Sequence, residues 1–264
     1  MKNIMGITKK IWVTYCDKGK TTLKAPIVIV GSSGLRSVGK IAVDVLIEKL
    51  QPRLFAELYS YGFPGVYYGP SYIGAPSSAG TIGAKGNLVE LPKVEFYLLE
   101  AENILIIRGY QAYDSLNQYL VADTVTDLFK QFHVKKVFSL GAQVIEEGIR
   151  CCATDQELLE EMSKHEIERT NVERFIGFSG LIVAIGEEKG IKGICLFAST
   201  TQNLRDAEEP DYYAAKELVD KLGEILGISV DTSDLEERGH KGDELTEEGE
   251  EEEEEESEYL SGYA

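Results

Sequence analysis

The sequence predicts one α/β domain with a mostly parallel central sheet that is covered by helices on both faces. Short apolar runs alternate along the chain with segments of helical periodicity. The run at 27–30, Ile-Val-Ile-Val, shows no polar alternation, as in strands that are buried on both faces of a parallel sheet. The chain has 264 residues, 43% of them hydrophobic, and no internal repeat or interior linker. Residues 1–232 are therefore expected to form a single domain with a large core.

The first elements are expected to organise the fold. We expect an edge strand around Ile11–Tyr15, the central strand at 27–30 and a glycine-rich turn, followed by a helix that ends before Pro52. The helix shows one apolar face, formed by Val38, Ile41, Ala42, Val45, Leu46 and Leu50. A strand, a glycine turn and a helix form the first half of a βαβ unit. The next strand is predicted at Arg53–Tyr61.

The middle of the chain opens with a long segment, 64–87, that is rich in Gly, Pro, Ser and Tyr. It is either a functional loop or a partner surface, or its aromatic residues pack back on the sheet. A hairpin is predicted from strands at 94–100 and 103–108, followed by a helix at about 115–132 and strands at 135–140 and 149–153.

The last part of the domain is predicted to hold three helices and one buried strand. Thr154 and Glu157 form a capping-box pattern that predicts a helix at 155–164. Further helices are expected within 177–190 and from Asp211 to Gly227, with a buried strand at 192–198 between them.

The acidic charge is concentrated at the C-terminus. Residues 233–264 carry fifteen acidic and two basic side chains, a net charge of −13 out of −18, which leaves −5 for residues 1–232. A segment of this composition cannot bury apolar surface, so 233–264 is expected to be a disordered tail. Neither part predicts binding to nucleic acid or to an anionic membrane, because both ligands attract basic patches.

The compartment is expected to be the cytoplasm. No apolar run approaches the ~20 residues of a spanning helix, and the first residues lack the apolar core of a signal peptide. The four cysteines show no Cys-x-x-Cys spacing, which favours reduced thiols over a metal site.

Catalytic motifs are nearly matched but not completed. Gly34-Leu-Arg-Ser-Val-Gly39-Lys40 follows a strand and opens a helix like a P-loop, but Ile41 stands where Mg²⁺ binding needs a hydroxyl. Ser33 and Ser179 each lack the last glycine of G-x-S-x-G, and the three histidines do not cluster in the sequence. We expect no catalytic residues, no cofactor and no metal. The alternative is a nucleotide- or nucleoside-dependent enzyme that uses the turn at 31–40.

The end of the chain suggests a different chemistry. Tyr263 and Ala264 present an aromatic ring next to a free carboxylate, which a pocket with an apolar wall and a lysine at its rim can hold. The alternative is that these residues are simply the end of a disordered tail.

Several segments together resemble the archaeal and bacterial proteasome-assembly-chaperone family, over residues 10–231. They are the glycine turn (Gly31, Gly34, Gly39), Gly109-Tyr-Gln-Ala-Tyr-Asp-Ser, Ala153-Thr-Asp-Gln-Glu-Leu-Leu-Glu-Glu, Gly177-Phe-Ser-Gly-Leu and Lys192-Gly-Ile-Cys-Leu-Phe-Ala-Ser-Thr.

The resemblance implies a phosphorylase-like three-layer α/β/α fold without retained catalytic residues, and homo-oligomers. It also implies binding to the α subunits of the 20S proteasome through a C-terminal hydrophobic–Tyr–X motif. By position, Tyr263 is the penultimate tyrosine and Ala264 supplies the carboxylate. Gly262 departs from the motif, because it stands where a hydrophobic residue is expected.

Overall fold

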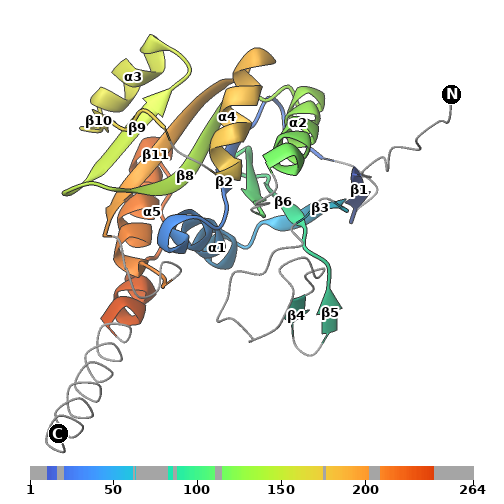
Figure 1. Ribbon diagram of the computed structural model, residues 1–264, viewed down its shortest axis with the longest axis horizontal. Helices are drawn as coiled ribbons and strands as arrows, with labels where there is room; N and C mark the ends of the chain where they lie inside the picture. Colours follow the sequence, from blue (N-terminus) through green and yellow to red (C-terminus); the bar gives the residue numbers. More distant parts are fainter. Residues whose placement is uncertain are drawn as a thin grey trace, which may run out of the picture.

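The computed structural model describes residues 11–16, 21–61, 63, 83–85, 88–110, 115–174, 177–201 and 209–240. Strands and helices alternate along most of the chain (Figure 1). The strands are β1 (Ile11–Tyr15), β2 (Ile27–Gly31), β3 (Arg53–Ser60), β4 (Gly83–Lys85), β5 (Leu88–Glu90), β6 (Val94–Leu99), β7 (Ile104–Arg108), β8 (Lys136–Val144), β9 (Ile149–Ala153), β10 (Glu168–Arg169) and β11 (Lys192–Thr200). The helices are α1 (Val38–Leu50), which follows a short 3₁₀ turn at Leu35–Ser37, α2 (Ser115–Gln131), α3 (Gln156–Ser163), α4 (Phe178–Glu188) and α5 (Tyr212–Leu226); residues 233–240 are also helical.

The central sheet has nine strands in the order β1-β3-β6-β7-β2-β8-β11-β9-β10. Its centre, β7-β2-β8-β11, is parallel, and so is the edge pair β9-β10. The pairs β1-β3, β3-β6, β6-β7 and β11-β9 are antiparallel. The prediction of a mostly parallel sheet is therefore wrong, and the sheet is mixed. Short connections such as the turn between β6 and β7 cannot make the crossover that parallel neighbours need.

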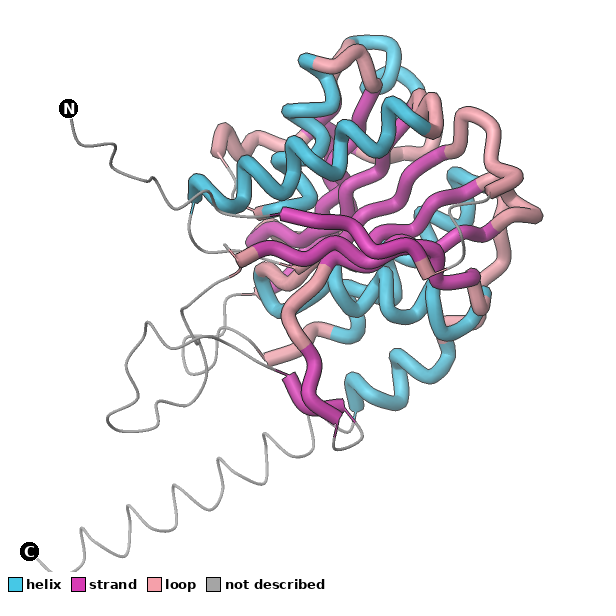
Figure 2. The backbone as a smooth tube through the Cα atoms, turned by 90° about the vertical axis from the view of Figure 1, so that its right-hand side faces the viewer, coloured by secondary structure: helices cyan, strands magenta, loops and turns pink. Residues whose placement is uncertain are grey.

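Helices cover both faces of the sheet and give three layers (Figure 2). Side chains from α1, α3 and α5 pack on one face, and side chains from α2 and α4 pack on the other. Strand β2 shows why its sequence is apolar throughout, because Ile29 joins the first cluster while Val28 and Val30 join the second. The buried-strand prediction for this segment is confirmed.

The glycines after β2 allow close packing of backbones. A Cβ atom on Gly31 would lie within 3.0 Å of the carbonyl oxygen of Gly39, and one on Gly39 within 3.0 Å of the carbonyl oxygen of Leu140. Helix α1 therefore begins in direct contact with β2 and β8. The two glycines are explained by this approach, without a bound phosphate.

Two local predictions need correction. Helix α3 is capped by Asp155, whose carboxylate accepts a hydrogen bond from the Leu158 N–H at 2.9 Å, and not by Thr154. The Thr154 hydroxyl accepts instead from the N–H of Gly193 on β11 at 3.0 Å. A long-range partner has taken the hydroxyl, and the next residue supplies the cap.

The second correction concerns the start of the tail. Residues 233–240, expected to be disordered, form a helix against α1 and α5, with Leu235 completely buried in the core. Structure thus continues past the expected domain boundary at residue 232. Residues 241–264 lie outside the described part of the chain.

Candidate functional site

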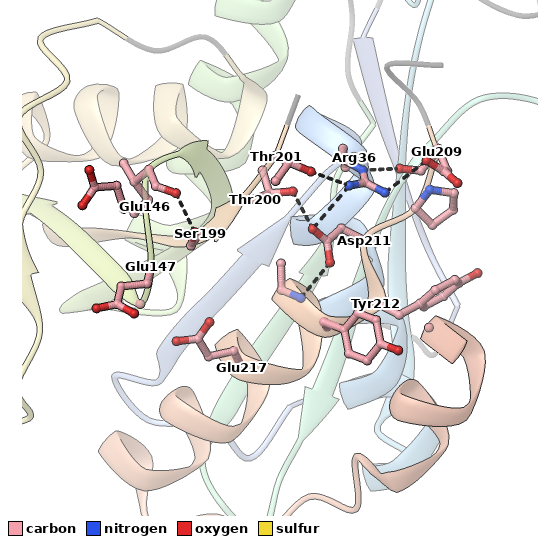
Figure 3. Close-up of a pocket in the computed structure, with 16 residues that line it drawn as sticks. Arg36, Glu146, Glu147, Ser199, Thr200, Thr201, Glu209, Asp211, Tyr212 and Glu217 are labelled. Atoms are coloured by element: carbon pink, nitrogen blue, oxygen red, sulfur yellow. Dashed lines mark hydrogen bonds and ion pairs between the residues drawn. The ribbon is translucent and has the colours of Figure 1, made fainter. Parts of the chain in front are cut away.

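The carboxyl ends of β2, β8 and β11 meet at one edge of the sheet, the edge where open α/β folds bind ligands. A pocket opens there (Figure 3). It is lined by Arg36 from the turn after β2, residues 145–148 after β8, residues 199–201 at the end of β11, residues 209–214 at the start of α5, and Glu217 and Gly239.

Arg36 ties the turn after β2 to the segment before α5. Its guanidinium donates from Nε to the Glu209 carbonyl oxygen at 3.1 Å, from Nη2 to Glu209 Oε2 at 3.2 Å and from Nη1 to Thr201 Oγ1 at 3.0 Å. Asp211 lies further away, with 3.8 Å between Arg36 Nη1 and Asp211 Oδ2. Arg36 has a left-handed backbone (φ 45°), as has Ser37 (φ 53°). The guanidinium is thus engaged by the protein's own groups.

Asp211 holds the start of α5 in place. One carboxylate oxygen accepts from the Ala214 N–H at 2.9 Å, which caps the helix, and the other accepts from the Thr200 hydroxyl at 2.5 Å. The predicted start of this helix at Asp211 is confirmed, and so is its end at Gly227. The pocket wall is therefore rigidly connected to β11.

The remaining charges of the pocket are negative. Glu146 and Glu147 follow β8 and Glu217 lies on α5 (Figure 3). Burial raises the pKa of Glu217, and the neighbouring carboxylates of Asp211 and Glu147 raise it further, against the opposing effect of Lys221. A pocket with this charge repels phosphate, which is bound where positive charge or free N–H groups converge.

Lys40, the lysine of the near-match to a P-loop, is held on its own helix. Its Nζ contacts Asp44 Oδ2 at 2.6 Å, and the other oxygen of Asp44 accepts from Arg108 Nε at 2.6 Å. Arg108 in turn contacts Glu95 at 2.8 Å. This network on the α1 face of the sheet occupies the lysine that a P-loop directs at phosphate.

The three histidines lie at separate places in the structure. His133 follows α2, His165 lies 3.3 Å from Glu224, and His240 lies 3.0 Å from the Tyr213 hydroxyl. Within the described ranges, no three His, Cys, Asp or Glu side chains gather as metal ligands, and no helix has the length and apolar character to cross a membrane.

The proposed binding residues Gly262, Tyr263 and Ala264 lie outside the described residues. The residues that precede this part of the chain, 232–240, are held against the domain by the contacts below. Leu235 of helix 233–240 is buried, and Asp234 Oδ1 contacts Lys49 Nζ of α1 at 3.0 Å. The segment begins at Thr232, whose hydroxyl donates to Asp220 Oδ1 of α5 at 2.7 Å. The described part of the chain therefore ends at residue 240, next to Gly239, which lines the pocket at the carboxyl edge of the sheet.

The helix at 233–240 was not predicted from the sequence, because the acidic composition of the segment indicated disorder. A signal was present, since Ser233 and Glu236 have the S-x-x-E spacing that marks a helix start. Leu235 was a single apolar residue among acids, and periodicity cannot be read from one residue.

Comparison with known proteins identifies relatives over nearly the whole chain. The model of the PAC2 family matches residues 28–248. An uncharacterized protein of Methanocaldococcus jannaschii is 27% identical over 240 residues, which are 88% of this chain and 83% of that protein.

Solved structures show the same fold. The crystal structure of Pyrococcus furiosus PbaB, described as an archaeal proteasome activator, matches with a TM-score of 0.77 at 26% identity, covering 92% of this chain and 99% of that one. P. furiosus PbaA, described as an archaeal homolog of proteasome-assembly chaperone, matches with a TM-score of 0.73 at 20% identity over 94% and 96% of the two chains. A proteasome-assembly chaperone homologue of Mycobacterium tuberculosis matches with a TM-score of 0.62 at 15% identity, over 84% and 94%.

Proposed function

Because this chain belongs to the PAC2 family, we propose that it is a non-catalytic protein of the proteasome-assembly-chaperone type that binds the α subunits of the 20S proteasome. The observation that carries the proposal is the match over 92% of the chain to a protein described as an archaeal proteasome activator. The body would act as a homo-oligomer, as the family resemblance implies, and the C-terminal segment would make the contact.

The carboxyl-edge pocket supports a non-catalytic role. Its only cation among the described lining residues is Arg36, which contacts Glu209 and Thr201, while its other charged side chains are acids. A nucleotide-dependent enzyme would need the opposite charge at this edge.

The anchored helix at 233–240 supports a role for the tail. From residue 240, the 22 residues to Gly262 span roughly 26 Å as a random coil, at ~5.5 Å × √n, and further when like charges repel. A tether of this length, leaving from a rigid point, brings Tyr263 and the Ala264 carboxylate to a partner without moving the body. Tethering also raises the effective concentration of each tail when several bodies assemble.

The test is co-purification with the 20S proteasome. Deleting residues 262–264, or replacing Tyr263 by Ala, is expected to abolish binding of the full-length protein. Tyr259→Ala is the matched control, because it removes a tyrosine from the same tail without changing the terminal pair, and it should bind normally.

Two results would overturn the proposal at different levels. Unchanged binding after deletion would show that the tail is not the contact and that the body is. Absence of binding by the full-length chain, with a calorimetric signal on adding ATP, GTP or nucleosides, would favour the enzyme alternative.

A further inference from the structure

A second pocket lies at the opposite, amino-terminal edge of the parallel strands. It is formed where the chain enters β2, where α2 leads into β8, and at the end of β1. The lining residues are Tyr15, Thr21, Leu23, Lys24, Ala25, Phe55, Gln131, Phe132 and His133, with no acidic residue among them.

The floor of this pocket is a row of aromatic rings. Phe55 is 2% exposed and meets Tyr15 edge-to-face at a centroid distance of 5.4 Å and Phe132 at 5.6 Å, both with an interplanar angle of 71°. Tyr15 remains 43% exposed, so the row is open to solvent on that side. A further ring that enters the pocket can continue the edge-to-face arrangement.

Lys24, in the lining of the pocket, has a fixed backbone and an exposed side chain. The backbone of Lys24 is held at both polar groups by the Asn103 side chain, with its N–H donating to Oδ1 at 3.0 Å and its carbonyl accepting from Nδ2 at 3.0 Å. Lys130 and Lys135, on either side of the lining segment 131–133, are exposed as well. The pocket therefore combines an aromatic floor with one lysine, Lys24, in its lining, and Lys130 and Lys135 are next to its lining segment in the sequence.

The end of this chain has the complementary chemistry. Residues 241–264 hold twelve acidic side chains and one lysine, and they end in Tyr263 and Ala264. We propose that the aromatic pocket at the amino-terminal edge binds the C-terminal Tyr-Ala of a second copy of this chain, with the Tyr263 ring over Phe55 and Phe132 and the terminal carboxylate near Lys24. The acidic residues before it would lie near Lys130 and Lys135.

A second copy fits the geometry better than the chain's own tail. The tail leaves the domain beside Gly239, which lines the pocket at the carboxyl edge. The nine residues of β8 separate the two edges by about 30 Å, at ~3.3 Å per residue, which exceeds the roughly 26 Å random-coil span of the tail. The chain's own tail would have to extend beyond that span and pass around the body. A neighbouring copy can present its tail directly.

While they are bound in the pocket, the terminal residues would not be available to another partner. It requires only the tail and the pocket, so it does not depend on the proteasome. If the proposed function also holds, the pocket and the α-ring compete for the same residues, and weakening the pocket would strengthen proteasome binding.

Photo-crosslinking with the full-length chain tests the contact in the absence of the proteasome. Unlabelled protein with Tyr263→p-benzoylphenylalanine is mixed with ¹⁵N-labelled wild-type protein and irradiated, and mass spectrometry identifies the labelled peptide that is captured. We expect labelled peptides that contain Tyr15, residues 21–25 or residues 131–133. Capture only of unlabelled peptides, capture elsewhere on the body, or no capture would overturn the proposal.

A charge-reversal pair separates the pocket from general attraction. Lys24→Glu in the labelled partner is expected to lower the crosslinking yield by about fivefold, since one favourable charge contact is replaced by repulsion. Lys164→Glu, at an exposed lysine after α3, makes the same change of net charge and should leave the yield unchanged. Equal losses with both variants would show that only net charge matters, and would also overturn the proposal.

Discussion

The docking of helix 233–240 can be measured through Leu235. This side chain is completely buried against α1 and α5, and truncation to alanine removes it from the core. Buried Leu→Ala substitutions cost about 2–5 kcal/mol. Because the segment is short and terminal, it can relax, so we expect the lower end of this range, about 2–3 kcal/mol. The ion pair of Asp234 with Lys49 adds little, because solvent screens a lysine at the surface.

Urea unfolding followed by circular dichroism provides the assay. With a slope of about 2–3 kcal/mol per molar urea, the midpoint should fall by about 1 M in Leu235→Ala. Leu120→Ala is the control, because Leu120 lies on α2 and is 39% exposed, and its midpoint should hardly change. A midpoint shift for Leu235→Ala no larger than that of the control would refute the docked helix, and with it the fixed exit point of the tail.

Two further predictions concern packing and capping. Gly39→Ala should destabilise the domain by at least ~1–3 kcal/mol in urea unfolding, because the new Cβ meets the Leu140 carbonyl. Gly186→Ala should be neutral or stabilising by up to ~1 kcal/mol, because the nearest neighbour of the new Cβ would be Ile191 Cβ at 3.6 Å and alanine favours a helix. A larger loss of stability in Gly186→Ala than in Gly39→Ala would contradict the packing argument. The hydrogen bond from the Leu158 N–H lowers the pKa of Asp155, so its stabilising effect is present above the unfolded pKa of ~3.9 and is lost as pH falls through the folded value. Asp155→Asn should therefore lose less stability than the wild type between neutral pH and pH ~3, and an identical acid dependence would count against the cap.

Most helices and strands were predictable because their signals are local. The Asp211 cap, the Gly227 stop and the unalternating run of β2 each depend on neighbours in sequence, and each is confirmed. The near-match to a P-loop shows the limit of such signals. Only the tertiary contacts show that Gly39 approaches Leu140 and that Asp44, the neighbour of Lys40 one turn along the same helix, also pairs with Arg108 of β7.

The candidate sites were less predictable, since each assembles residues far apart in the chain. Arg36 meets Glu209 across 173 positions, and the aromatic pocket joins residues 15, 55 and 132. No motif marks either pocket. The proposed contact residues Gly262, Tyr263 and Ala264 remain a prediction, because they lie outside the described residues.

By itself, the sequence determined the α/β class, the order of the elements and the acidic end of the chain, because local periodicity and composition decide these. The antiparallel direction of β6 and β7 follows from the hairpin that the sequence predicts, but the antiparallel pairing of β1 with β3 and of β9 with β11 was decided only by the tertiary structure. The same holds for Leu235, whose burial depends on packing in one core cluster with side chains of α1 and α5. The acidic lining of the pocket at the carboxyl edge, and the lack of acids in the described lining of the pocket at the amino edge, also depend on the fold, because they arise from residues that meet only when the sheet is formed.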